Sequence, residues 1–136
     1  MKSLLKQTVI ILSLISFHAS AVTVIVHPSN NTSASQSDLK KIFLGKSKSF
    51  PDGAPAVPLD LSSGEVRTEF VTKVLSKSES QVKAYWSKRI FTGKGQPPKA
   101  LDSEAEVIKL VSETPNLIGY VSDGAVTDAV KVLAKF

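Results

Sequence analysis

Residues 56–71 read AVPLDLSSGEVRTEFV, and this stretch decides the fold because it passes from a strand through a turn into a helix. Residues 56–61 favour a short strand, and Pro58 places it at a sheet edge or a bulge, since proline cannot donate to a ladder. Ser62-Ser63-Gly64-Glu65 has the S-x-x-E spacing of a capping box, in which the serine and the glutamate satisfy free amides. A helix is therefore predicted to begin near Ser63.

The predicted helix after Ser63 carries an apolar stripe at helical spacing with one cation inside it. The stripe consists of Val66, Phe70, Val71, Val74 and Leu75. Arg67 points into the middle of this stripe. A guanidinium in that position needs a partner, because an unpaired charge is costly to bury.

Further elements follow on both sides of this stretch. Strands are predicted over residues 22–26, 117–121 and 130–133. Ser37 or Asp38 is predicted to cap a helix that carries Leu39, Ile42 and Phe43 and stops at Gly45. Capping patterns at residues 78–81 and 103–106 predict two more helices. The first of these buries Val82, Tyr85, Trp86 and Ile90 and ends near Phe91, and the second runs to about Ser112.

The predicted order is β-α-β-α-α-α-β-β, which indicates a mixed α/β fold with parallel pairing where helices connect strands. The chain has 136 residues, enough for one domain. It is 42% hydrophobic and 21% charged, so disorder is excluded. No cysteine is present and histidines number two, which argues against a disulfide framework, thiolate zinc or a histidine metal cluster.

The N-terminal 21 residues are interpreted as a cleavable secretory signal. Lys2 and Lys6 precede an apolar run over residues 9–17, and Ala19-Ser20-Ala21 is a small-x-small cleavage pattern. A transmembrane helix is the competing interpretation, but a bilayer span needs about 20 apolar residues. We therefore expect a domain over residues 22–136 in the periplasm. Its net charge of +3 is spread among acids, which does not indicate nucleic-acid binding.

No catalytic constellation is evident, and the chain is not predicted to be an enzyme. After removal of the signal only His27 remains for a triad, and no G-x-S-x-G or Walker pattern occurs. The strongest candidate site is Ser62, Ser63, Gly64 and Arg67. Helix-start amides, hydroxyls and an arginine fork are the parts of an anion pocket. The alternative is structural: Ser62 caps, Gly64 eases the turn, and Arg67 pairs with a carboxylate such as Asp60.

The order of several blocks resembles the phosphate-binding component of phosphate ABC transporters. The blocks are residues 38–46 (DLKKIFLGK), Asp52-Gly53 with Pro58, Ser63-Gly64, residues 67–70 (RTEF), Tyr85-Trp86, residues 91–93 (FTG) and residues 114–121 (TPNLIGYV). The resemblance implies a single lobe of the type II periplasmic-binding-protein fold. It also implies phosphate or a related oxyanion as ligand, held by Ser62, Ser63, Gly64 and Arg67, without a cofactor or a metal.

Two departures from that family shape the expected function. Gly64 is followed by Glu65 where the family commonly has a threonine, which adds a carboxylate that repels anions. The predicted mature length leaves no room for a second lobe, so a protein partner or a second copy would have to supply the opposite cleft wall. The leading hypothesis is an oxyanion-binding protein with a role in phosphate uptake. The alternative is a ligand-free module that docks onto a periplasmic or outer-membrane partner.

Overall fold

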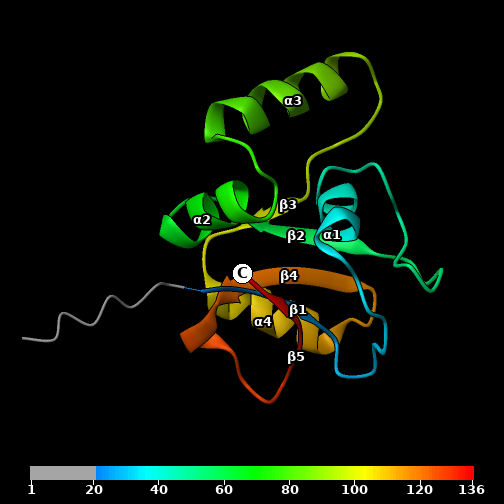
Figure 1. Ribbon diagram of the computed structural model, residues 1–136, viewed down its shortest axis with the longest axis vertical. Helices are drawn as coiled ribbons and strands as arrows, with labels where there is room; N and C mark the ends of the chain where they lie inside the picture. Colours follow the sequence, from blue (N-terminus) through cyan, green and yellow to red (C-terminus); the bar gives the residue numbers. More distant parts are fainter. Residues whose placement is uncertain (1–20) are drawn as a thin grey trace, which may run out of the picture.

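The computed structural model describes residues 21–136, so the predicted signal segment lies almost wholly outside the described residues (Figure 1). Five strands form one sheet in the order β3-β2-β4-β1-β5. The strands are β1 Val22–Val26, β2 Val57–Leu61, β3 Lys99–Leu101, β4 Leu117–Ser122 and β5 Lys131–Lys135. The helices are α1 Gln36–Phe43, α2 Glu65–Lys73, α3 Glu79–Phe91 and α4 Glu104–Glu113, with a 3₁₀ turn at Asp123–Ala125. The predicted mixed α/β class is confirmed.

Strand direction follows the connections. β2 pairs in parallel with both β3 and β4, and helices connect these strands along the chain. β1 lies between β4 and β5 and is antiparallel to both. All five residues of β1 are buried, as expected for a strand of β-branched residues, apolar except for Thr23, inside a sheet.

Pro58 lies in an interior strand, and the pairing around it is staggered. Val57 and Pro58 pair with β4, whereas pairing with β3 begins only at Leu59. Pro58 therefore has no β3 neighbour that would require its missing N–H. β3 itself was not predicted, because three residues after Pro97-Pro98 carry too little alternation to indicate a strand.

Helices cover both faces of the sheet. The contacts of two successive residues of β4, Gly119 and Tyr120, show which helices lie on which face. Tyr120 stacks on Phe70 of α2 with ring centroids 3.8 Å apart and meets Phe43 of α1 edge-on at 6.1 Å. Gly119 faces α4, where an added Cβ would lie 2.5 Å from Val107. Because neighbouring strand residues point to opposite faces, α1 and α2 lie on one face and α4 on the other.

Serine caps begin three of the helices, although one differs from the predicted cap. Ser35, not Ser37 or Asp38, caps α1, and Asp38 completes a capping box from the third helical position. Ser78 caps α3 with Gln81 in a full capping box, as predicted. Ser103 caps α4 by accepting a hydrogen bond from the Glu106 amide.

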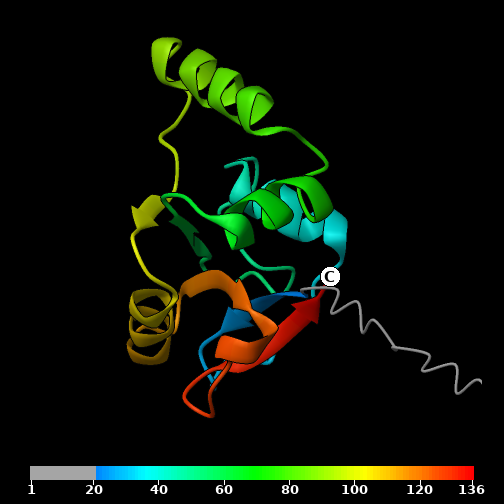
Figure 2. The ribbon, with the colours of Figure 1, turned by 90° about the vertical axis from the view of Figure 1, so that its left-hand side faces the viewer.

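Helix α3 forms one end of the molecule (Figures 1 and 2). Trp86 is buried, as predicted, and an added Cβ on Gly45 would lie 3.1 Å from its ring. The Tyr85 hydroxyl donates to the Leu44 carbonyl at 2.6 Å, which also ties α3 to the end of α1. The prediction that Ile90 is buried is wrong, since its side chain is 47% exposed at the far end of α3.

No helix among residues 21–136 has the length and apolar character to cross a membrane.

Candidate functional site

The predicted site residues lie where β2 ends and α2 begins. β2 and β3 are parallel neighbours, so their carboxyl ends meet at one edge of the sheet. The loop after β2 leads into α2, and Asp102 and Ser103 after β3 lead into α4. Two strand ends and two helix starts therefore converge here, which is where open α/β sheets commonly place ligands.

Ser62 connects the two loops and does not cap α2. Its hydroxyl donates to the Asp102 carboxylate at 2.9 Å, and its amide donates to the Leu101 carbonyl at 2.9 Å. The cap of α2 is Gly64, with φ of 103° and no side-chain cap bond. The prediction of a capping box formed with Glu65 is therefore wrong. Gly64 adopts a left-handed conformation that favours glycine, as the structural alternative proposed for this turn.

Arg67 binds two carboxylates. Its Nη1 donates to Asp60 and to the Leu61 carbonyl, and its Nε lies 3.2 Å from the Glu79 carboxylate. Burial alone would lower the pKa of Arg67, but the charges of Asp60 and Glu79 outweigh it and raise that pKa. The contact with Asp60 is the one that the structural alternative predicted. Nη2 has no hydrogen bond to any described residue, so one arm of the fork remains open.

Tyr120 also binds the Asp60 carboxylate, a role that the sequence did not predict. Its hydroxyl donates to Asp60 and accepts the Leu61 amide at 3.2 Å. Burial, followed by the charge of Asp60, raises the pKa of Tyr120, so the phenol stays protonated and acts as a donor. A tyrosine within a buried strand is the available sequence signal, because a buried hydroxyl needs a partner.

The four predicted residues open onto two neighbouring hollows. Ser62 and Arg67 line a hollow of about 460 Å³ beside the start of α3. Ser63 and Gly64 line a second hollow of about 360 Å³ beside the start of α4. The structure therefore brings all four to one edge of the sheet but divides them into two pairs.

The charges around the two hollows differ. The hollow beside α3 has two cations, Arg67 and Lys83, and two carboxylates, Asp60 and Glu79. The hollow beside α4 is lined by the carboxylates of Glu65, Asp102 and Glu104 and by no basic residue. An anion at Ser63 would be repelled by these three acids, whereas the hollow beside α3 is electrically balanced.

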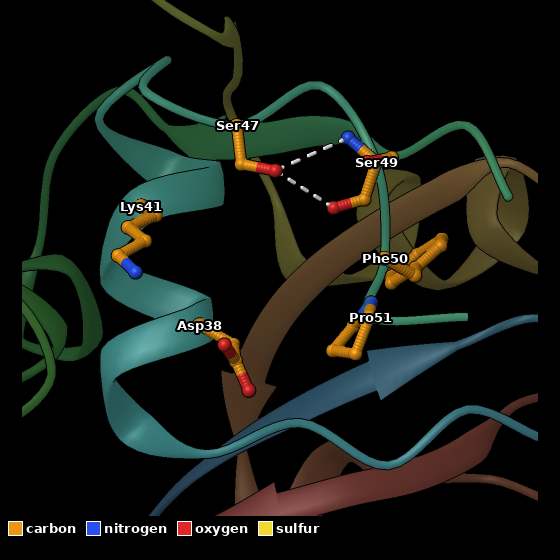
Figure 3. A pocket seen from close by; sticks show the side chains of 6 residues that line it. All are labelled: Asp38, Lys41, Ser47, Ser49, Phe50 and Pro51. Atoms are coloured by element: carbon orange, nitrogen blue, oxygen red, sulfur yellow. Dashed lines mark hydrogen bonds between the residues drawn. The ribbon is translucent and has the colours of Figure 1, made fainter. Parts of the chain in front are cut away.

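A further hollow of about 280 Å³ lies beside α1 (Figure 3). Asp38 and Lys41 come from the helix, and Ser47, Ser49, Phe50 and Pro51 come from the loop after it. The Ser47 hydroxyl donates to the Ser49 carbonyl at 3.0 Å, and Asp38 accepts from Ser35. These polar groups are thus already paired within the chain.

Among residues 21–136, no group of three or more His, Cys, Asp or Glu side chains is arranged so that it could hold a metal ion. His27, whose ring lies near Ser29, belongs to a local turn. The arrangement at the sheet edge can donate hydrogen bonds and carries charged groups of both signs.

No protein-family model matches the chain. A search of curated proteins also finds no match. Solved structures do match, and they share the fold. A protein from Clostridium perfringens, described as a phosphate ABC transporter substrate-binding protein with bound phosphate, superimposes with a TM-score of 0.63 at 20% identity. An ABC-type phosphate transport receptor from Vibrio cholerae gives a TM-score of 0.63 at 18% identity. PstS from Borrelia burgdorferi gives 0.58 at 21% identity.

These matches cover 84–85% of this chain but only 44–47% of the other proteins. The chain therefore spans less than half the length of the proteins that it matches. The fold is that of periplasmic binding proteins, and the chain corresponds to roughly half of each of them. The predicted resemblance and the predicted fold are confirmed at this level.

Proposed function

We propose that the chain is a periplasmic, non-enzymatic binding protein whose ligand is phosphate or a related oxyanion. The site is the sheet edge formed by Ser62, Ser63, Gly64 and Arg67. The fold supports this proposal, because the matched proteins are substrate-binding proteins of phosphate transport and one of them holds phosphate. We also propose a role in phosphate uptake, which the same likeness supports.

The observation that carries the proposal is the uncapped start of α2. Gly64 has no side chain with which to cap the helix, and the first hydrogen bond within the helix runs from the Thr68 amide to the Gly64 carbonyl. The amides of Glu65, Val66 and Arg67 precede that bond and have no acceptor inside the helix. These amides, with the positive end of the helix dipole, suit an oxyanion.

In this proposal each side chain at the site has a different role. The Ser63 hydroxyl makes no hydrogen bond within the described residues and is free to donate to an anion. Arg67 contributes Nη2, while its other nitrogens hold it in place through Asp60 and Glu79. Ser62 positions the loop through Asp102. A second molecule, either a protein partner or another copy of this chain, supplies the opposite wall of the cleft.

The substitution Glu65→Thr tests the proposal. It removes a repelling carboxylate and adds a hydroxyl, so phosphate binding should tighten by at least about 1 kcal/mol, or roughly fivefold in Kd. Calorimetric titration of inorganic phosphate measures this change. Glu113→Thr removes the same charge at the far end of α4 and serves as the matched control. Absence of phosphate binding by both the wild type and Glu65→Thr would contradict the proposal.

A second candidate function, a ligand-free docking module for a periplasmic or outer-membrane partner, is favoured by the carboxylates at the site. Arg67 is already paired with two of them, and Glu65, Asp102 and Glu104 surround Ser63. In this case phosphate should leave the midpoint of chemical denaturation unchanged, because only a ligand of the folded state raises it. The same charged edge would then contact the partner.

A further inference from the structure

The charge of the chain is concentrated in one segment. Residues 77–99, which include α3 and the loop after it, contain six basic residues and one acidic residue, a net charge of +5. Residues 100–136 contain three basic and six acidic residues, a net charge of −3. The only acid of the basic segment, Glu79, is bound by Arg67. The positive charge of this segment is therefore unopposed locally.

The same segment exposes the largest apolar side chain on the described surface. Phe91 is 92% exposed and Ile90 is 47% exposed, both in the last turn of α3. Lys88 lies one turn before Phe91, so a cation and an aromatic ring share one side of the helix. Apolar side chains that are so exposed at the end of a projecting helix are available to contact another surface.

The cations near Phe91 surround a small hollow. It has a volume of about 240 Å³ and is lined by Tyr85, Lys88, Arg89, Thr92 and Lys94. Three of these residues are cations, and none is an acid. Arg89 is fixed here because its Nη2 donates to the carbonyls of Gly45 and Lys94 at 3.3 Å. The hollow thus presents a positive surface held in place by the body of the protein.

We propose that the outer face of α3 and the loop after it dock onto an anionic phospholipid surface. Lysines 83, 88 and 94 attract the lipid phosphates, and Ile90 and Phe91 enter the headgroup region. Basic residues attract anionic headgroups, and an exposed aromatic ring beside them can insert at the membrane interface. Figure 2 shows that α3 stands at the end of the molecule, where a flat surface can reach it.

The composition of this face favours lipid over a protein partner. The exposed residues of α3 before Phe91 include Ser80, Lys83, Ala84, Ser87 and Lys88. Serine, alanine and lysine are depleted in protein–protein interfaces, where aromatic residues and arginine gather. Lysine instead suits lipid phosphates, because its ammonium group is a point charge around which mobile headgroups can rearrange. A bilayer of anionic lipid therefore complements the charge of this face.

Co-sedimentation with vesicles tests the proposal. Exported protein, its N-terminus verified by mass spectrometry, is mixed with phosphatidylcholine vesicles that contain about one-third phosphatidylglycerol or none. All variants are compared in the same N-terminal form, so any contribution of residues 1–21 is common to them. Wild type should bind only the anionic vesicles, and binding should weaken with added salt, because the Debye length shortens.

Two variants and one control locate the surface. Lys83→Gln, Lys88→Gln and Lys94→Gln combined should lower the partition coefficient about 100-fold, since each lysine contributes roughly fivefold. Phe91→Ser should lower it at least about tenfold. Lys41→Gln, Lys109→Gln and Lys131→Gln combined remove the same charge elsewhere and should retain binding. All of these side chains are exposed, so denaturation midpoints should remain close to that of the wild type.

Several results would overturn the proposal. One is equal binding to neutral and anionic vesicles, and another is binding that the α3 variants do not change. A third is binding to immobilised polyglutamate with no binding to anionic vesicles, which would assign the face to an acidic protein. Loss of phosphate binding in calorimetry bears only on the sheet edge, so failure of the two proposals can be distinguished.

Discussion

At the scale of single residues, Arg67 and Tyr120 hold one carboxylate between them. Asp60 accepts from the guanidinium and from the phenol, while Leu61 binds both groups through its carbonyl and amide. The end of β2 is therefore fixed in place before any ligand arrives. Because these groups share partners, their contributions to stability should not be additive.

We expect Arg67→Ala to lower the free energy of unfolding by about 1–3 kcal/mol, because it leaves Asp60 short of a partner in a partly buried position. Chemical denaturation measures the loss, with the exposed Lys41→Ala as control. Tyr120→Phe keeps the ring stacked on Phe70 and removes only the hydroxyl. A double-mutant cycle that gave strictly additive losses would contradict a shared network.

A pH dependence follows at residue scale from Asp38. Hydrogen bonds from the amide and hydroxyl of Ser35 lower its pKa in the folded protein below the ordinary value of 3.8. Its stabilising contribution is therefore present above pH 3.8 and is lost as pH falls through the lower folded pKa. Asp38→Asn should be less stable than wild type near neutral pH, and the difference should vanish under strong acid. Denaturation midpoints that differ equally at both pH values would count against this assignment.

At the scale of elements, local signals predicted most helices and strands but not their partners. Capping patterns predicted the starts of α3 and α4, because a serine followed by a polar side chain three residues later acts within one turn. The same pattern failed at Ser62, whose hydroxyl turns instead to Asp102, forty residues further along the chain. A tertiary contact of this kind leaves no trace in local spacing.

Two other element-scale differences have the same origin. The short β3 forms only because β2 offers it a parallel edge. Ile90 has helical spacing from Trp86, yet α3 extends beyond the body that covers Trp86, so Ile90 is left exposed. The sequence predicted the contact of Arg67 with Asp60, as the structural alternative, whereas anion binding by Ser62, Ser63, Gly64 and Arg67 stays a prediction. Sequence reasoning missed Tyr120, and it could not separate the two hollows.

The packing of α4 on β4 gives a test at this scale. Gly119 allows the close approach, since an added Cβ would lie 2.5 Å from Val107 and 3.5 Å from Val111. Gly119→Ala should therefore destabilise the fold by about 1–3 kcal/mol through overpacking. Gly124→Ala is the control, because nothing lies within 4 Å of its added Cβ. Equal thermal midpoints for the two variants would show that α4 can shift at no cost.

At the scale of the whole molecule, acidic and basic residues gather on different parts of the surface. The sheet edge that we propose for an oxyanion is rich in acids, and the end formed by α3 is rich in lysine. Attraction of phosphate to the sheet edge must therefore come from oriented amides and Arg67, since the surrounding side chains repel it. Anionic surfaces are instead drawn to the opposite charge at α3. The two proposals thus depend on different parts of the molecule, which border each other at Lys83.

The N-terminal boundary gives the last prediction, that the mature protein begins at Val22. The first described strand, β1, begins at this residue: Val22 is fully buried and exchanges two hydrogen bonds with Phe136, at 3.1 and 2.9 Å. Cleavage after Ala21 removes the carbonyl that accepts the Asp123 amide but keeps β1 whole. Cleavage further along would remove residues from the interior strand of the sheet.

Mass spectrometry of exported protein measures the new N-terminus. The signal peptidase recognises small residues at two positions, and the position between them accepts most residues. Ala21→Lys should therefore leave residues 1–21 attached and hold the chain in the membrane fraction, whereas Ser20→Lys should be processed like the wild type. Wild-type chain that kept Met1 to Ala21, or Ala21→Lys chain that was still cut before Val22, would contradict the assignment of a cleavable signal.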